Sequence, residues 1–113
     1  MVTIYHNPRC SKSRQTLELL RSRGIDPEVV LYLENPPNTL ELTQLLQKLA
    51  ISAEQLLRRS EQEFKDNFRG LELTETQLIE AMIRYPKLIE RPIVVAGDRA
   101  VLGRPPEKVL EII

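Results

Sequence analysis

The chain has 113 residues, 42% of them hydrophobic and 28% charged, and its 16 basic and 16 acidic side chains leave no net charge. This composition is typical of one globular domain, and the balanced charge argues against a protein devoted to nucleic acid, which usually carries a basic excess. Because no apolar run approaches the roughly 20 residues that cross a bilayer and no signal peptide is recognisable, we expect no membrane partner and a cytoplasmic location.

The first third of the chain predicts a strand, a helix and a second strand. Residues 2–5 are rich in β-branched and aromatic side chains, which favour a strand. Residues 11–23 contain no proline or glycine and predict a helix, with Gly24 where its C-cap would lie. The apolar run 29–33 predicts a strand buried on both sides. Together they form a βαβ unit, in which the two strands are parallel and the crossover is right-handed.

The middle of the chain, at about residues 38–90, predicts a helical insert. Three capping-box signatures, each with Glu or Gln three residues after the cap, indicate helix starts at Asn38, Ser52 and Thr74. Leucines that recur with helical spacing predict the buried face of the first of these helices: Leu42, Leu45, Leu46 and Leu49.

The last part of the chain predicts a hairpin and a closing helix. Residues 92–96 and 99–102 flank a Gly-Asp turn and indicate two antiparallel strands, and residues 107–113 indicate a helix. The order βαβ, helical insert, ββα is that of an α/β thioredoxin-like fold, so we expect residues 1–113 to form a single domain. Pro92 lies where that fold places a cis-proline facing the active-site thiol.

Cys10 is the only cysteine, and it lies in a polar segment between the first strand and the first helix. Free backbone N–H groups and the helix dipole favour an anion there, and nearby cations lower a thiol pKa further. Lys12 and Arg14 supply such cationic surroundings, and Ser13 is a hydrogen-bond donor one turn away. His6 would add positive charge if it were protonated. We therefore expect Cys10 to be an exposed, activated thiolate nucleophile.

The spacing around Cys10 excludes several known kinds of site. Ser13 occupies the position that a Cys-x-x-Cys pair would need, so the thiol that resolves an oxidised Cys10 must come from another molecule. A tyrosine-phosphatase-type loop places five residues between its cysteine and its arginine, whereas Arg14 follows Cys10 after only three. The chain has no Walker motif and no zinc-ligand spacing, so we expect no metal.

Three arginines near element junctions are candidates for binding an oxyanion: Arg58, Arg91 and Arg104. The planar guanidinium group suits bidentate binding of tetrahedral oxyanions. Any one of the three could instead be a solvated surface residue. In a thioredoxin-like fold, however, Arg91 and Arg104 flank the hairpin that lies next to the loop with the cysteine.

Five blocks of the sequence, in register over nearly the whole chain, resemble the glutaredoxin-coupled arsenate reductase (ArsC) family. They are residues 5–14, 32–37, 56–58, 91–95 and 104–105. The resemblance implies that Cys10 is the nucleophile, that His6 and Ser13 support its thiolate, and that the three arginines bind the arsenic oxyanion. It also implies arsenate as the substrate, glutathione as the co-substrate, glutaredoxin as the partner that regenerates the thiol, and no bound cofactor.

Two alternatives stay open at this point. Arg9, Ser11 and Lys12 surround the cysteine, whereas well-characterised family members carry small neutral residues after it. One alternative is another glutathione-dependent thiol oxidoreductase, acting on protein mixed disulfides, which would have no need of three arginines. The other is a non-enzymatic, Spx-like regulator of transcription that senses redox state. Such regulators often use the Cys-x-x-Cys pair that Ser13 removes.

Overall fold

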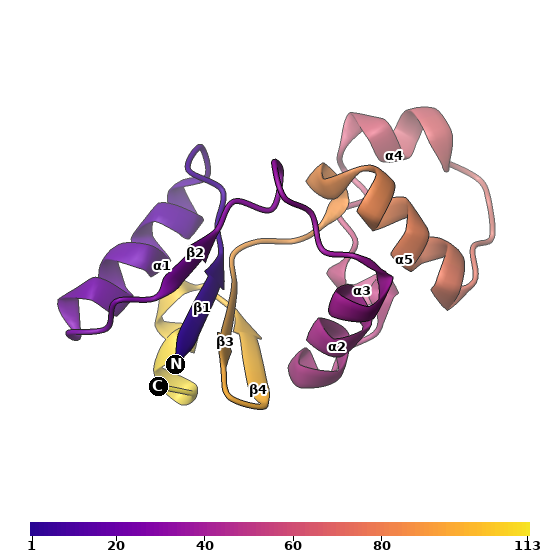
Figure 1. Cartoon of the computed structure of the whole chain (residues 1–113). Helices are drawn as coiled ribbons and strands as arrows, with labels where there is room; N and C mark the ends of the chain where they lie inside the picture. The colour runs from indigo at the N-terminus through magenta and orange to yellow at the C-terminus, as the bar shows by residue number, and fades with distance from the viewer. The chain divides into compact units, whose positions relative to one another are not determined.

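The computed structural model describes all 113 residues, which divide into two compact units (Figure 1). The first unit comprises Met1–Asn35 and Arg91–Ile113 and contains the β-sheet. The second unit, Pro36–Glu90, is built from helices. None of the helices is long and apolar enough to span a membrane.

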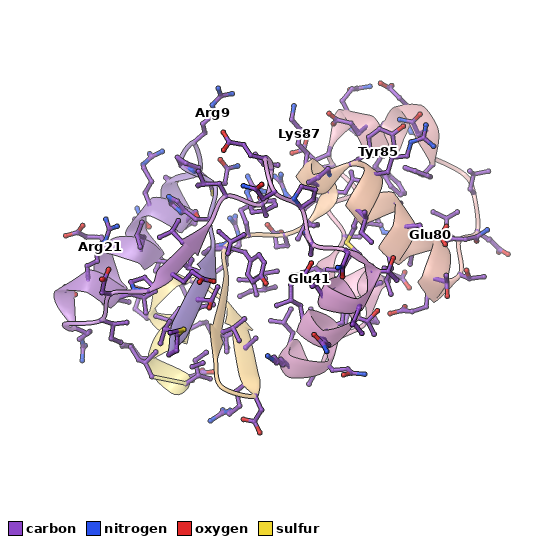
Figure 2. All side chains as sticks on the ribbon, in the orientation of Figure 1. Arg9, Arg21, Glu41, Glu80, Tyr85 and Lys87 are labelled. Atoms are coloured by element: carbon purple, nitrogen blue, oxygen red, sulfur yellow. The ribbon has the colours of Figure 1, made fainter.

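A four-stranded sheet in the order β2-β1-β3-β4 forms the first unit. Strand β1 (Val2–Tyr5) pairs in parallel with β2 (Glu28–Val30) and antiparallel with β3 (Ile93–Ala96). β3 then pairs antiparallel with β4 (Arg99–Leu102). Helix α1 (Ser11–Ser22) connects the two parallel strands and carries charged side chains such as that of Arg21 on its exposed side (Figure 2). The predicted βαβ and ββα orders are confirmed.

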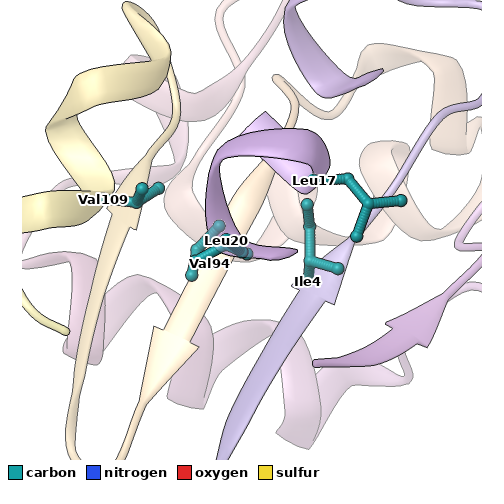
Figure 3. Packing of buried hydrophobic residues seen from close by; sticks show 5 residues of the cluster. All are labelled: Ile4, Leu17, Leu20, Val94 and Val109. Atoms are coloured by element: carbon teal, nitrogen blue, oxygen red, sulfur yellow. The ribbon is translucent and has the colours of Figure 1, made fainter. Parts of the chain in front are cut away.

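The core of the first unit lies between the sheet and two helices, α1 and the 3-10 helix η2 (Pro106–Glu111). Five buried side chains form it (Figure 3): Ile4, Leu17, Leu20, Val94 and Val109. Full burial of one such side chain stabilises the fold by about 1.5–3 kcal/mol. This packing fixes α1 against the sheet and so places the helix N-terminus at the end of β1.

Two predicted elements of the first unit differ from the structure. The predicted strand 29–33 is shorter and begins earlier, since β2 is Glu28–Val30 and the chain then turns. β2 is also an edge strand with β1 as its neighbour, and Val29 is 37% exposed, so the expectation of burial on both sides is wrong. The closing segment, predicted as a helix over 107–113, is the 3-10 helix η2, the tighter form common in short terminal pieces.

The second unit contains four α-helices and a 3-10 helix. They are α2 (Thr39–Leu49), α3 (Ala53–Leu56), α4 (Gln62–Asn67), α5 (Glu75–Arg84) and η1 (Pro86–Leu88). The three predicted capping boxes are confirmed, because the side chains of Asn38, Ser52 and Thr74 each accept from a backbone N–H group three residues later. α4 was not predicted, since its N-cap, Glu61, forms no side-chain cap and so leaves no signature in the sequence.

The predicted leucine stripe of α2 is confirmed for its first three members. Leu42, Leu45 and Leu46 are buried, whereas Leu49 in the last turn of the helix is half-buried. The helical spacing therefore identified the face of α2 that packs inward.

Candidate functional site

Cys10 is the N-cap residue of α1, where the loop after β1 enters the helix. Its backbone is extended (φ −97°, ψ 122°), its N–H group donates to the carbonyl oxygen of Asn7 (3.0 Å), and its own carbonyl accepts from Arg14 (3.0 Å). The residue is 8% exposed, so the expectation of an exposed thiol is wrong. The reason is that the thiol is surrounded by the first turn of α1 and by two arginines from other segments of the chain, Arg91 and Arg104.

Burial by itself raises the pKa of the Cys10 thiol, but other groups together lower that pKa below its ordinary value. They are the backbone N–H of Ser13, the charge of Arg91, the backbone N–H of Lys12 and a hydrogen bond from the Arg91 side chain. The sulfur forms no N-cap hydrogen bond of regular geometry. The N–H groups at the start of α1 nevertheless favour the thiolate, as a helix N-terminus does for any anion.

Arg91, just before β3, and Arg104, just after β4, converge on the sulfur from the open end of the β3–β4 hairpin. Nη1 of Arg104 lies 3.9 Å from Sγ of Cys10 and 3.4 Å from the carbonyl oxygen of Arg91. The register of the hairpin explains why they meet, because Ile93 pairs with Leu102 at its open end. Residues just before β3 and just after β4 therefore lie at the same edge of the sheet.

A proline follows each of these two arginines, and both peptide bonds, Arg91–Pro92 and Arg104–Pro105, are cis. Pro92 lies where the thioredoxin-like fold places a cis-proline, although the sequence alone did not establish the isomer of the first bond. Nothing in the sequence pointed to the second. Pro92 is among the fully buried residues of the chain, at the start of the segment that leads into β3.

His6 and Ser13 form a buried polar pair at the same loop. Nδ1 of His6 lies 2.6 Å from Oγ of Ser13, and the same Oγ accepts from the backbone N–H of Asn7 (3.0 Å). Burial lowers the pKa of His6, and the charges of Arg21 and Arg14 lower it further. His6 is therefore neutral at neutral pH and does not add positive charge at the thiol.

Lys12 and Arg14, the cations closest to the cysteine in sequence, both have exposed side chains. Nη1 of Arg14 donates to the carbonyl oxygen of Pro8 (2.9 Å), which ties α1 to the loop before Cys10. Lys12 acts on the thiol through its backbone N–H group rather than through its ammonium group. The side-chain charge that favours the thiolate comes from Arg91, far away in the sequence.

Arg58 belongs to the helical unit, where it follows α3. Its guanidinium group pairs with the carboxylates of Glu61 and Glu90, the latter with Nε 3.6 Å from Oε1. Its backbone N–H donates to the carbonyl oxygen of Leu88 (2.8 Å). The first unit thus brings Cys10, Arg91 and Arg104 together, while the contacts described for Arg58 lie within the second unit.

Thr16, which was not predicted from the sequence, is fully buried in α1 and bonds to Gly103. The signal was present, because Thr16 falls on the same buried face as Leu17 and Leu20. A polar side chain on the apolar face of a helix needs a hydrogen-bond partner, and this need is the signal that the sequence contains.

A cavity of about 270 Å³ opens beside the loop that contains the cysteine. His6, Asn7 and Arg9 line it from the loop, and Leu31 and Glu34 line it from the segment after β2. No group of three or more His, Cys, Asp or Glu side chains lies together as a metal centre would require. The arrangement combines a thiol whose pKa is lowered, two guanidinium groups and the N–H groups at the start of α1, which suits nucleophilic attack on a bound oxyanion.

The chain is similar over nearly its whole length to several known proteins. The model of the ArsC family matches residues 5–112. The uncharacterized protein YfgD of Escherichia coli is 55% identical over 99% of this chain and 96% of its own length. An arsenate reductase of Haemophilus influenzae is 46% identical over 99% of this chain and 98% of its own. The solved structure of an arsenate reductase from Vibrio cholerae is 49% identical, covers 99% of this chain and 97% of its own, and has a TM-score of 0.94, which confirms the thioredoxin-like fold.

Proposed function

The chain belongs to the ArsC family, and from this premise we propose that it reduces arsenate to arsenite, with Cys10 as the nucleophile and glutathione and glutaredoxin as the external thiols. One observation carries the proposal: the guanidinium groups of Arg91 and Arg104 meet at a thiol whose pKa is lowered. The relatives from Haemophilus influenzae and Vibrio cholerae that are named arsenate reductases add support.

The first task of the site is to hold the arsenate anion. Guanidinium groups bind tetrahedral oxyanions through paired N–H donors, and Arg91 and Arg104 present them beside Sγ of Cys10. The N-terminus of α1, where Cys10 is the N-cap, adds partial positive charge at the same site. Arg58 is the third arginine that we propose for the anion, on the family resemblance.

The first chemical step joins sulfur to arsenic. The Cys10 thiolate attacks the arsenic(V) atom, a sulfur–arsenic bond forms, and one hydroxyl group takes a proton and leaves as water. No electrons have moved to arsenic at this stage. Groups that stabilise the thiolate favour this step because only the ionised sulfur is a good nucleophile.

Glutathione then supplies the second thiol. Its sulfur displaces another hydroxyl group as water, so that arsenic carries two sulfur atoms. A sulfur–sulfur bond forms as both arsenic–sulfur bonds break, and one electron pair stays on arsenic. Arsenic(V) becomes arsenic(III), each sulfur is oxidised by one electron, one water adds back to arsenic, and the products are arsenite and a mixed disulfide between Cys10 and glutathione.

Regeneration needs a thiol from outside the chain, because Cys10 is the only cysteine. A glutaredoxin thiolate attacks the glutathione sulfur of the mixed disulfide, takes over the glutathionyl group and releases the Cys10 thiolate. Such chemistry belongs to the reducing cytoplasm, where glutathione keeps thiols reduced, and this supports a cytoplasmic location for the protein.

We place glutathione in the cavity beside the loop. Glutathione carries two carboxylates and one ammonium group, and the cavity offers a cation, Arg9, and an anion, Glu34, from its two sides. Arg9 directly precedes Cys10 in the chain and its side chain extends outward (Figure 2), so a carboxylate bound to it would be held at the loop that leads to the sulfur. Leu31 supplies apolar contact surface between the charged groups.

A coupled assay tests the proposed function. Purified protein is mixed with arsenate, glutathione, glutaredoxin and glutathione reductase, and arsenate reduction is followed as loss of NADPH. We expect turnover only when arsenate, glutathione and glutaredoxin are all present, and no turnover for Cys10→Ser. Absence of any arsenate-dependent rate in the wild-type protein would refute the substrate assignment. A rate with a glutathionylated peptide in place of arsenate would then favour the mixed-disulfide oxidoreductase.

A further inference from the structure

Thr16 is a fully buried threonine in the second turn of α1. A β-branched side chain loses freedom in a helix, and a buried hydroxyl group destabilises the fold unless it is hydrogen-bonded. The Oγ1 atom of Thr16 lies 2.8 Å from the carbonyl oxygen of Lys12 and 3.2 Å from that of Gly103. The single hydroxyl proton is therefore shared between the first turn of α1 and the segment that follows β4.

Both backbone polar groups of Gly103, its N–H and its carbonyl oxygen, are hydrogen-bonded. Its N–H group donates to the carbonyl oxygen of Pro92 (2.9 Å), and its carbonyl oxygen accepts from Thr16 (3.2 Å). A Cβ atom at Gly103 would lie 2.5 Å from Oγ1 of Thr16 and 2.8 Å from Cγ of Pro92, closer than such atoms approach. The absence of a side chain at Gly103 is thus what allows the three segments to meet.

The residues that meet here are next to those that surround the thiol. Pro92 directly follows Arg91, and Gly103 directly precedes Arg104. Cys10 is the N-cap residue of the helix that contains Thr16. The contact of Thr16, Gly103 and Pro92, which we term the Thr16–Gly103 tie, therefore joins the three segments of the chain that carry the sulfur and its two arginines.

We propose that Thr16 and Gly103 are positioning residues for Cys10, because they hold the guanidinium groups of Arg91 and Arg104 at the sulfur for oxyanion binding and attack. Neither residue acts on the sulfur directly. The role goes beyond the proposed function, since a positioned thiolate and anion site would be needed for any oxyanion substrate.

The other groups that favour the thiolate do not depend on the tie. The backbone N–H groups of Lys12 and Ser13 are part of α1 and move together with Cys10. His6, on the loop, is neutral at neutral pH because its pKa is lowered. Loss of the tie should therefore weaken only the contribution of the arginines, and the thiol pKa should rise part of the way toward its ordinary value.

Thr16→Val tests the proposal, because valine keeps the branched shape and removes the hydroxyl group. The thiol pKa is measured from the ultraviolet absorbance of the thiolate, and anion binding from the protection that arsenate gives Cys10 against iodoacetamide. We expect the pKa to rise and the arsenate concentration for half-protection to increase between about two- and tenfold, the equivalent of one hydrogen bond. Thr16→Ser keeps the hydroxyl group and loses only the methyl group, so both values should equal those of the wild-type protein.

Two control variants separate positioning from general loosening. Val109→Ala removes a buried side chain of the same unit that belongs to the core and not to the tie. Thr43→Val removes an equivalent hydroxyl bond, from Oγ1 to the carbonyl oxygen of Thr39 (2.8 Å), on the exposed side of α2. We expect both variants to keep the wild-type thiol pKa and the wild-type arsenate protection, although Val109→Ala should unfold at lower urea concentration.

Wild-type pKa and protection in Thr16→Val would show that Thr16 only packs, and would overturn the proposal. Equal changes in Val109→Ala would do the same, since any loosening would then suffice. If Thr16→Val does not fold, Gly103→Ala takes its place, with the same rise in pKa expected and an unchanged pKa counting against the tie. None of these measurements needs turnover, so the proposed arsenate reduction can fail while the positioning role stands, and the reverse.

Discussion

Nδ1 of His6 lies 2.6 Å from Oγ of Ser13, and this buried pair joins the end of β1 to the first turn of α1. The backbone N–H of Asn7 donates to the same Oγ, so the Ser13 hydroxyl is hydrogen-bonded to both His6 and Asn7. The pair therefore fixes the loop that leads to Cys10 from both of its ends. In this arrangement His6 contributes shape and hydrogen bonding to the site rather than charge.

Ser13→Ala should destabilise the protein because it removes the partner of both His6 and Asn7. Buried polar groups that lose their partner cost about 1–3 kcal/mol, and we expect a loss of that size in the free energy of unfolding. Urea unfolding measures it. The matched control is Ser22→Ala, which removes an exposed hydroxyl bond to the carbonyl oxygen of Leu19 (2.7 Å) and should change stability by less than about 0.5 kcal/mol. Equal losses in the two variants would argue against a special role for the His6–Ser13 pair.

The lowered pKa of His6 predicts a loss of stability in acid. Unfolded histidine takes up a proton near pH 6.5, whereas folded His6 does so only at lower pH. The unfolded state thus binds more protons in this window, so the stability due to neutral His6 is complete above about pH 6.5 and is lost as the pH falls through the folded pKa.

Urea midpoints between about pH 5.5 and pH 7.5 measure this dependence. The thiol pKa is also lowered, so its contribution falls as the pH drops from about 8.5 toward the folded pKa. The comparison is therefore made in Cys10→Ser protein, with and without His6→Gln. His6 is the only histidine, and its replacement should flatten the profile. An unchanged slope in His6→Gln would mean that other groups cause the acid sensitivity.

Arg91→Ala should raise the pKa of the Cys10 thiol, because both the charge and the hydrogen bond of Arg91 favour the thiolate. Protection of Cys10 by arsenate should weaken by about tenfold or more, as expected for loss of a hydrogen bond to a charged group. Arg99→Ala, at the exposed start of β4, is the control and should leave both quantities unchanged. If Arg99→Ala matched Arg91→Ala, net charge rather than the position of Arg91 would explain the effect.

The cavity that we assign to glutathione makes a separate prediction. Arg9→Ala and Glu34→Gln should each raise the KM for glutathione several-fold, since each removes one charged partner, about 1 kcal/mol at an exposed site. Neither should change the protection of Cys10 by arsenate. Arg23→Ala, at the end of α1, removes the same charge elsewhere and serves as the control. A change in arsenate protection with an unchanged KM for glutathione would place glutathione outside this cavity.

Local patterns in the sequence predicted most of the fold. The cap residues Asn38, Ser52 and Thr74 identified three helix starts, because their side chains bond to N–H groups only three residues away. The strands on either side of Gly97 were found for the same reason, since a hairpin turn depends on a few adjacent residues. The predicted strand 29–33 is longer than β2. Its predicted burial on both sides is also wrong, because an apolar run alone does not distinguish an edge strand from a central one.

The placement of Cys10 at the start of α1 was likewise determined by the sequence itself. The end of a strand, a polar loop and the start of a helix follow each other within a few residues, and local rules suffice to recognise them. The lone cysteine also determined that any resolving thiol must come from another molecule.

Only the tertiary structure decided which charge acts on that sulfur. Lys12 and Arg14 are the nearest cations in sequence, yet their side chains are exposed and the guanidinium of Arg91 lies at the thiol instead. Arg91 and Arg104 arrive there because β1 pairs with β3 and β3 with β4, and because buried side chains hold α1 against that sheet. Those pairings join residues far apart along the chain, and they exist only when the whole first unit buries its core.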